Sequence, residues 1–121
     1  MVFDELYKEL AEREAKARGM GGPEKLARRG QAGVLNARER LDHLMDQGSF
    51  LESGLLAESA IAADRARSPA DGKIAGYGTV DGRDVAVVSN DFTVKGASSA
   101  ATNMKKVGQM QRTAVERGIP L

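Results

Sequence analysis

The chain has 121 residues, of which 41% are hydrophobic but only 4% aromatic, so its core must consist mainly of small and aliphatic side chains. Its 18 Lys and Arg residues balance 17 Asp and Glu residues, and a net charge of +1 argues against a dedicated nucleic-acid binder. It contains no cysteine, which excludes disulfides, a cysteine nucleophile and a cysteine-ligated zinc site.

Residues 2 to 18 are expected to form a helix that stands largely in water. Its apolar residues share one narrow stripe: Phe3, Leu6, Tyr7 and Leu10. Acid–base pairs at a spacing of four surround the stripe: Glu9 with Arg13, Glu12 with Lys16, and Glu14 with Arg18. Because so thin a stripe cannot support an isolated helix, we expect the helix to lie on another part of a larger assembly.

Asp4 and Glu5 stand where a signal peptide would need basic residues, and no apolar run approaches the roughly 18 residues of a membrane span. We therefore expect a soluble, cytoplasmic protein that contacts no membrane and no nucleic acid.

Two shorter helices are predicted next. Pro23 is suited to the first position of a helix that runs to about Arg29. Asn36 and Glu39 have the spacing of a reciprocal capping box for a second helix that ends near Gly48. The buried face of that helix is expected to contain Leu41, Leu44 and Met45. Residues 49 to 72 are predicted to be a connection with a short strand near Phe50 and some helix near Ala60.

A tight hairpin is predicted around Asp81-Gly82, the dipeptide preferred where both central turn residues need φ > 0. Its register follows from the turn: Val80 faces Arg83, Gly78 faces Val85, and Gly76 faces Val87. The two strand glycines favour close packing over a ligand role. The second strand is apolar on both faces over residues 85 to 88, which predicts that it is covered on both sides, as in a layered α/β domain.

A helix from about Ser99 to Arg117 is expected to follow, capped by Gly118. Its apolar stripe is predicted to comprise Ala100, Met104, Val107, Gly108, Ala114, Val115 and Gly118. Gln111 is the polar residue in the middle of that stripe, and it would need a hydrogen-bond partner if buried. Residues 119 to 121 are expected to begin a strand parallel to the hairpin's second strand, which indicates a longer chain.

Two segments together resemble a known family. Residues 37 to 50 (ARERLDHLMDQGSF) and residues 76 to 98 (GYGTVDGRDVAVVSNDFTVKGAS) are similar to signatures of the biotin-dependent acyl-CoA carboxyltransferases. The resemblance implies an α/β, crotonase-like fold, with two such domains in each subunit of a homo-oligomer. It implies a helical arm over residues 1–48, a connection over 49–72, and the start of the N-terminal carboxyltransferase domain over 73–121.

The reaction implied by this resemblance moves a carboxyl group from carboxybiotin to the α-carbon of an acyl-CoA. Biotin would be carried on a separate domain or subunit, loaded by a biotin carboxylase, and no metal is implied in this chain. The enolate needs backbone N–H donors. In the family these donors follow the strand that begins here at Ile119, so no catalytic residue is assigned. The implied CoA-contact loop comprises Phe92, Thr93, Val94, Lys95, Gly96, Ala97 and Ser98.

Several alternatives stay open at this stage. The subunit could belong to a biotin-dependent acyl-CoA decarboxylase, or the chain could be a non-catalytic interaction module, and the acyl group is undetermined. Lys95 could be a solvated loop lysine, and His43 is expected at the surface without metal partners. Asp91 is expected to tie the loop that follows it. For the basic cluster a subunit contact or a solvated face is favoured over an anion site: Lys25, Arg28, Arg29, Arg38 and Arg40.

Overall fold

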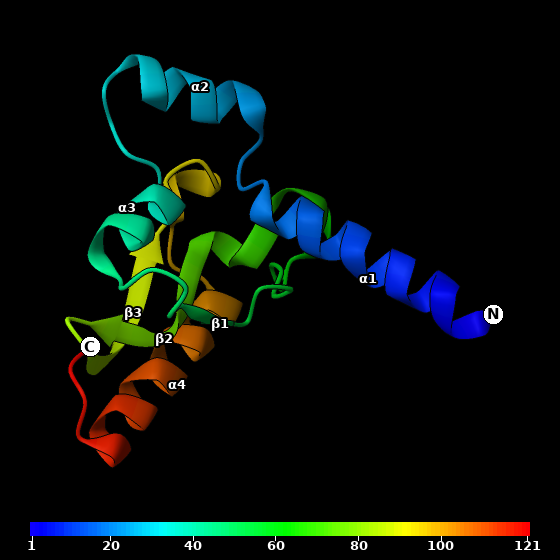
Figure 1. Ribbon diagram of the computed structural model, residues 1–121. Helices are drawn as coiled ribbons and strands as arrows, with labels where there is room; N and C mark the ends of the chain where they lie inside the picture. The colour runs from blue at the N-terminus through cyan, green and yellow to red at the C-terminus, as the bar shows by residue number, and fades with distance from the viewer.

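The computed structural model describes residues 1–121 and places a small antiparallel sheet between helices (Figure 1). The helices are α1 Val2–Arg18, α2 Pro23–Gln31, α3 Ala37–Leu44 and α4 Ala101–Arg117. The strands are β1 Leu51–Ser53, β2 Lys73–Val80 and β3 Arg83–Asn90. Three short 3₁₀ segments complete the chain: η1 Ala62–Arg67, η2 Pro69–Gly72 and η3 Lys95–Ala97. None of the helices combines the length and apolar composition that crossing a membrane requires.

The hairpin of β2 and β3 has the predicted register. The sheet order is β1-β2-β3 with antiparallel pairs, and Val80 faces Arg83, Gly78 faces Val85, and Gly76 faces Val87. Asp81 and Gly82 have φ values of 49° and 77°, as the expected two-residue turn requires. The turn chemistry alone was therefore sufficient to set the pairing of both strands.

A carboxylate from outside the hairpin holds its turn. The Asp46 carboxylate accepts hydrogen bonds from the Thr79 hydroxyl at 2.6 Å and from the N–H groups of Asp81 and Gly82, both at 2.9 Å. Asp46 lies two residues after the end of α3, so these bonds fix the end of that helix to the tip of the sheet. This explains structurally why an aspartate occupies this place in the first signature segment.

Replacing Asp46 with asparagine is expected to lower the midpoint of unfolding, because a neutral amide presents only one acceptor oxygen to these donors. The hydrogen bond from Thr79, followed by that from Gly82, lowers the pKa of Asp46 from its ordinary 3.8. The stabilisation is therefore present above pH 3.8 and is lost as the pH falls through the lower folded-state pKa. Unfolding midpoints of the two proteins should converge in acid.

The matched control for this prediction is Asp42→Asn, because Asp42 is an exposed carboxylate on α3. Midpoints of thermal unfolding would be measured from about pH 6 down to about pH 2. Equal effects of the two substitutions at neutral pH would show that the hydrogen bonds to the turn do not stabilise the protein.

The glycines of β2 allow close packing, as predicted. A Cβ at Gly76 would lie 2.2 Å from the Leu51 carbonyl oxygen, and one at Gly78 would lie 2.4 Å from the Met45 methyl carbon. At both positions, atoms of neighbouring residues therefore occupy the space that a side chain would need. The segment that runs from the end of α3 into the edge strand β1 occupies this bare side of β2.

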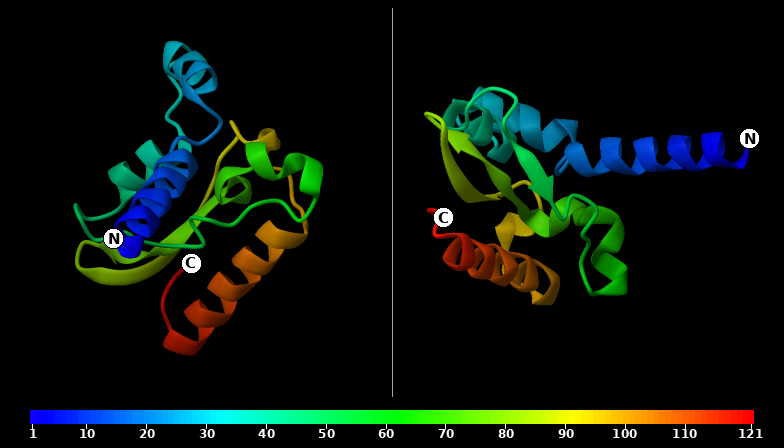
Figure 2. Two further views of the ribbon diagram at one scale, coloured as in Figure 1. Left: turned by 90° about the vertical axis from the view of Figure 1, so that its right-hand side faces the viewer. Right: turned by 60° about the horizontal axis from the view of Figure 1, so that its bottom comes forward.

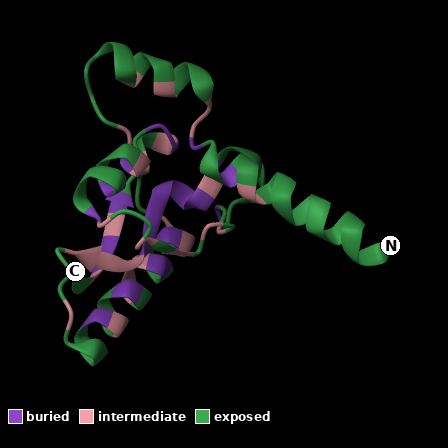
Figure 3. Ribbon diagram, viewed as in Figure 1, coloured by how far each residue is buried: buried purple, intermediate pink, exposed green.

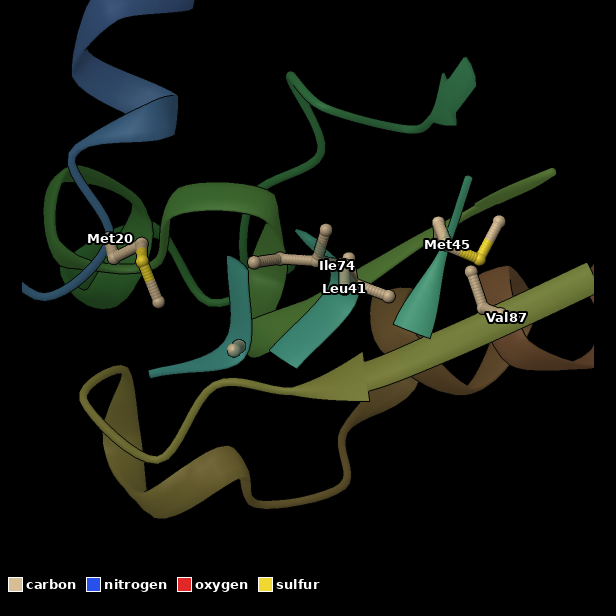
Figure 4. Close-up of a cluster of buried hydrophobic side chains, with 6 residues drawn as sticks. Met20, Leu41, Met45, Ile74 and Val87 are labelled. Carbon is tan, nitrogen blue, oxygen red and sulfur yellow. The ribbon is translucent and has the colours of Figure 1, made fainter. Parts of the chain in front are cut away.

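Hydrophobic clusters cover both faces of the hairpin. Figure 3 shows the buried stretches of the chain, and Figure 4 shows the cluster on the α3 face. On the α3 face the buried residues are Met20, Ala37, Leu41, Met45, Ile74 and Val87. On the α4 face they are Ala75, Ala86, Met110 and Ala114. The expectation that β3 is covered on both sides is confirmed, and the core consists mostly of aliphatic and small residues.

The predicted faces of two helices need correction. In α4 the buried residues are Asn103, Lys106, Met110 and Ala114, whereas Met104 and Val115 are exposed. Gln111 is also exposed. The predicted stripe is right at Ala114, but it omitted three buried residues: Asn103, Lys106 and Met110. Likewise α3 ends at Leu44, not near Gly48, and the Leu44 side chain is exposed.

Three local predictions are confirmed: the capping box of α3, the exposed helix α1 and the end of α4 at Gly118. The capping box of α3 is formed by reciprocal bonds between Asn36 and Glu39. Helix α1 projects away from the sheet with its apolar stripe exposed (Figure 2). Gly118 ends α4 with φ 66°, and the Ala86 N–H then donates to the Pro120 carbonyl oxygen at 2.8 Å. The chain thus returns to the free edge of β3, but residues 119 to 121 do not form the predicted strand.

Candidate functional site

The loop from Phe92 to Ser98 is tied at its start by Asp91. One oxygen of this buried carboxylate accepts hydrogen bonds from the Thr93 N–H at 3.0 Å and from the Thr93 hydroxyl at 2.5 Å. The Asp91 N–H donates to the Gly72 carbonyl oxygen at 2.9 Å. The predicted tying role of Asp91 is therefore confirmed, and the chain leaves β3 in a defined direction.

The middle of the loop turns through three consecutive residues with positive φ: Lys95 at 50°, Gly96 at 61° and Ala97 at 55°. The Ala97 carbonyl oxygen accepts a hydrogen bond of 3.1 Å from the buried Lys73 ammonium group. Apart from Gly96 and its two chain neighbours, no residue has an atom within 4 Å of the position that a Cβ would take at Gly96. The loop therefore exposes open backbone at a place that is held firmly from beneath.

The seven candidate residues do not all face the same way. Thr93 and Val94 are buried, Lys95 and Ala97 are half-buried, and Phe92, Gly96 and Ser98 are exposed. Only part of the loop can therefore contact a ligand. Asn103 donates its side-chain amide to the Ser98 carbonyl oxygen at 2.8 Å, which joins the end of the loop to α4.

The start of α2 packs against this loop, although the two are distant in sequence. The Gly21 N–H donates to the Thr93 hydroxyl at 2.9 Å, and the Lys25 ammonium donates to the Thr93 carbonyl oxygen at 3.3 Å. A Cβ at Gly21 would lie 2.1 Å from that carbonyl oxygen, so only glycine permits the contact. This contact brings the basic face of α2 beside Phe92.

A hollow of about 420 Å³ lies between α2 and the loop. Its charged lining residues are all basic: Lys25, Arg28, Arg29 and Lys95. The Arg29 guanidinium carbon lies 5.6 Å from the centre of the Phe92 ring, within the range of a cation–π contact. We call this space the α2–loop hollow; it combines positive charge with an exposed aromatic ring.

The basic cluster seen in the sequence divides in space. Lys25, Arg28 and Arg29 line the α2–loop hollow, whereas Arg38 forms two hydrogen bonds with Glu52 at 2.7 Å and 3.2 Å. Arg40 and His43 are exposed on α3. These basic residues are close together in the sequence, but in the structure they belong to different surfaces.

The charge of Lys95 is shared with a neighbouring carboxylate. Its ammonium group donates to Asp64 at 2.9 Å, and Asp64 also accepts from the Arg67 guanidinium. The contacts with Lys95, and then with Arg67, lower the pKa of Asp64, so this carboxylate is ionised at neutral pH. Lys95 is therefore held at the rim of the hollow and still has N–H donors for an anion. The sequence offered no signal for this partner.

Comparison with known proteins places these features in context. A family model described as a carboxyl transferase domain matches residues 28–121. The propionyl-CoA carboxylase beta chain of Cereibacter sphaeroides is 35% identical over 120 residues, covering 97% of this chain and 24% of the relative. The methylmalonyl-CoA decarboxylase subunit alpha of Veillonella parvula is 34% identical over 115 residues, covering 93% of this chain and 23% of the relative.

A solved structure of transcarboxylase 12S, a hexamer with methylmalonyl-CoA and methylmalonic acid bound, matches with a TM-score of 0.87 and 33% sequence identity. The match covers 95% of this chain and 23% of that chain. The chain therefore spans about a quarter of the length of these relatives.

Proposed function

Because the chain belongs to the carboxyl transferase domain family, we propose that its protein moves a carboxyl group from carboxybiotin to the α-carbon of an acyl-CoA. The chain has the fold of a crotonase-like carboxyltransferase, as its structural match with transcarboxylase 12S shows. Membership of this family argues against the non-catalytic module. A biotin carboxylase, a biotin carrier and further copies of the subunit would be the partners of the whole protein.

The α2–loop hollow is the observation that supports the substrate class. CoA presents an adenine ring and several phosphate oxygens, and the hollow presents an aromatic ring beside four basic side chains. We propose that the loop from Phe92 to Ser98 contacts CoA, with Lys95 donating to a phosphate and open backbone at Gly96 allowing close approach. Biotin would carry the carboxyl group, and no residue of this chain is assigned to binding biotin.

No side chain in this hollow needs to act as an acid or base on the α-carbon. The negative charge of an enolate is best stabilised by fixed N–H donors at the reacting carbonyl, whereas these residues are suited to the remote phosphates. Binding energy from the remote part of a substrate positions the reactive part. The expected contribution of the hollow is thus affinity and orientation.

Replacing Lys95 with methionine is expected to raise KM for acyl-CoA roughly tenfold or more, since one hydrogen bond between charged groups is lost. The value of kcat should change little. The assay is incorporation of labelled bicarbonate into acyl-CoA by the full-length subunit with its biotin carboxylase and carrier. Lys105→Met, which changes an exposed lysine of α4, is the control. An unchanged KM would remove Lys95 from the CoA contact.

A second candidate function runs the same transfer in reverse. It is favoured by the relative from Veillonella parvula, which is named as a decarboxylase subunit and matches 93% of this chain. The two functions differ in the partners of the full-length subunit, which would be identified by purifying the subunit with its native complex. A biotin carboxylase in that complex would favour carboxylation, and a biotin carrier without a biotin carboxylase would favour decarboxylation.

A further inference from the structure

We propose that Arg28 and Arg29 of α2 bind the 3′-phosphate of the CoA adenosine and that the exposed Phe92 ring stacks on its adenine base. The inference rests on the proposed function, because that function supplies CoA as the ligand. Arg28 and Arg29 lie outside the loop, and the part of CoA that they would recognise is its 3′-phosphate. It also reverses the expectation that this basic cluster is a subunit contact or a solvated face.

The charges on α2 are available to a ligand. None of the ion pairs in the structure involves Arg28, Arg29 or Lys25. By contrast, the fourth basic residue of the hollow, Lys95, is already paired with Asp64. Because no acidic side chain lines the hollow, a doubly charged phosphate would meet an unbalanced positive field there.

Arginine can contact both the phosphate and the adenine base of this ligand. A planar guanidinium donates two parallel hydrogen bonds to a phosphate and can also stack on an aromatic surface. Arg29 already lies over the Phe92 ring, with 5.6 Å between its guanidinium carbon and the ring centre. Phe92 is 50% exposed, which leaves ring surface for a base.

The surface is positioned before any ligand arrives. Gly21 and Lys25 hold the start of α2 on Thr93, which in turn is held by Asp91. The arginines are therefore carried on a short helix that is fixed to the proposed CoA loop. Preorganisation of this kind reduces the entropy lost on binding.

The test uses isothermal titration of the full-length subunit with three probes: CoA, dephospho-CoA, which lacks the 3′-phosphate, and adenosine 3′,5′-bisphosphate. The variant is Arg28→Gln/Arg29→Gln, and Arg40→Gln is the control because Arg40 is an exposed arginine on α3. We expect the double variant to weaken binding of CoA and of the bisphosphate at least about tenfold. Binding of dephospho-CoA should weaken much less, and the control should match wild type.

Three results would overturn the inference: equal loss of affinity for CoA and dephospho-CoA, no loss for either, or a changed oligomeric state with unchanged CoA affinity. The last would show that α2 is a subunit contact. The bisphosphate carries no acyl group, so its loss of binding in the double variant supports the inference even if carboxyl transfer is absent. Retained CoA binding without carboxyl transfer would instead contradict the proposed function alone.

Discussion

Replacing Gly76 with valine is expected to lower the free energy of unfolding by about 3 kcal/mol, the upper part of the range for overpacked sites. The first added carbon would lie 2.2 Å from the Leu51 carbonyl oxygen, 2.7 Å from the Phe50 ring and 3.0 Å from the Glu52 Cα. Two of these three atoms are backbone, so a change of side-chain rotamer cannot relieve the clash. Strand β1 would have to move away from β2.

The matched control is Gly108→Ala in α4. A Cβ there would lie 3.8 Å from the Arg112 guanidinium, an ordinary contact, and alanine is the better helix former. A gain of up to about 1 kcal/mol is expected for the control. Free energies of unfolding from urea titrations would measure both variants. A loss below about 1 kcal/mol for Gly76→Val would show that β1 is not tightly packed on β2.

Raising the pH is expected to stabilise the wild-type protein relative to Lys106→Met, by on the order of 2 kcal/mol in total. Lys106 is only 8% exposed and donates to the carbonyl oxygens of Ala70 at 2.7 Å and Lys73 at 2.6 Å. Desolvation of its ammonium group lowers the pKa from 10.5 to about 8, although the charges of Glu52 and Asp71 offset part of the effect.

The sign follows from which state binds the proton more tightly. Between pH 8 and 10.5 the unfolded chain keeps the Lys106 proton while the folded protein loses it, so stability rises with pH. Below pH 8 the cost of the buried charge is fully present, and above 10.5 it is removed. Because other groups also titrate, the informative quantity is the difference between wild type and Lys106→Met.

Unfolding of both proteins would be measured in urea from about pH 7 to about pH 10.5. Lys105→Met, which alters an adjacent but exposed lysine, should follow the wild-type pH dependence. Parallel curves for wild type and Lys106→Met would show that Lys106 has an ordinary pKa and is solvated. Stability that rises faster in wild type would confirm the buried ammonium group.

The hairpin and the capping box could be predicted because their signals lie within a few residues. Asp81-Gly82 selects one turn type, and that turn determines the register of Gly76 and Gly78. The capping box needs only Asn36 and Glu39, which are three residues apart. Both patterns depend on backbone dihedral angles and local hydrogen bonds, which the sequence specifies directly.

The α4 stripe was largely misplaced because the spacing of its apolar and small residues did not identify Asn103 and Lys106 as part of the buried face. Lys106 is buried because the carbonyl oxygens of Ala70 and Lys73 accept hydrogen bonds from its ammonium group. Gly54 also leaves room for the Lys106 side chain. Neither acceptor can be identified without knowing where η2 and β2 run. The exposed Met104 and Val115 follow from the same rotation of the helix.

The sequence by itself determined the hairpin, the capped helix α3 and, through two signature segments, the family and the loop from Phe92 to Ser98. Only the tertiary structure decided which charges lie near that loop. Gly21 meets Thr93 across 72 positions, and this contact carries Arg28 and Arg29 to the hollow while leaving Arg38 and Arg40 elsewhere. Local geometry is encoded by neighbouring residues, whereas the positive field of a site is the sum of charges that only long-range contacts bring together.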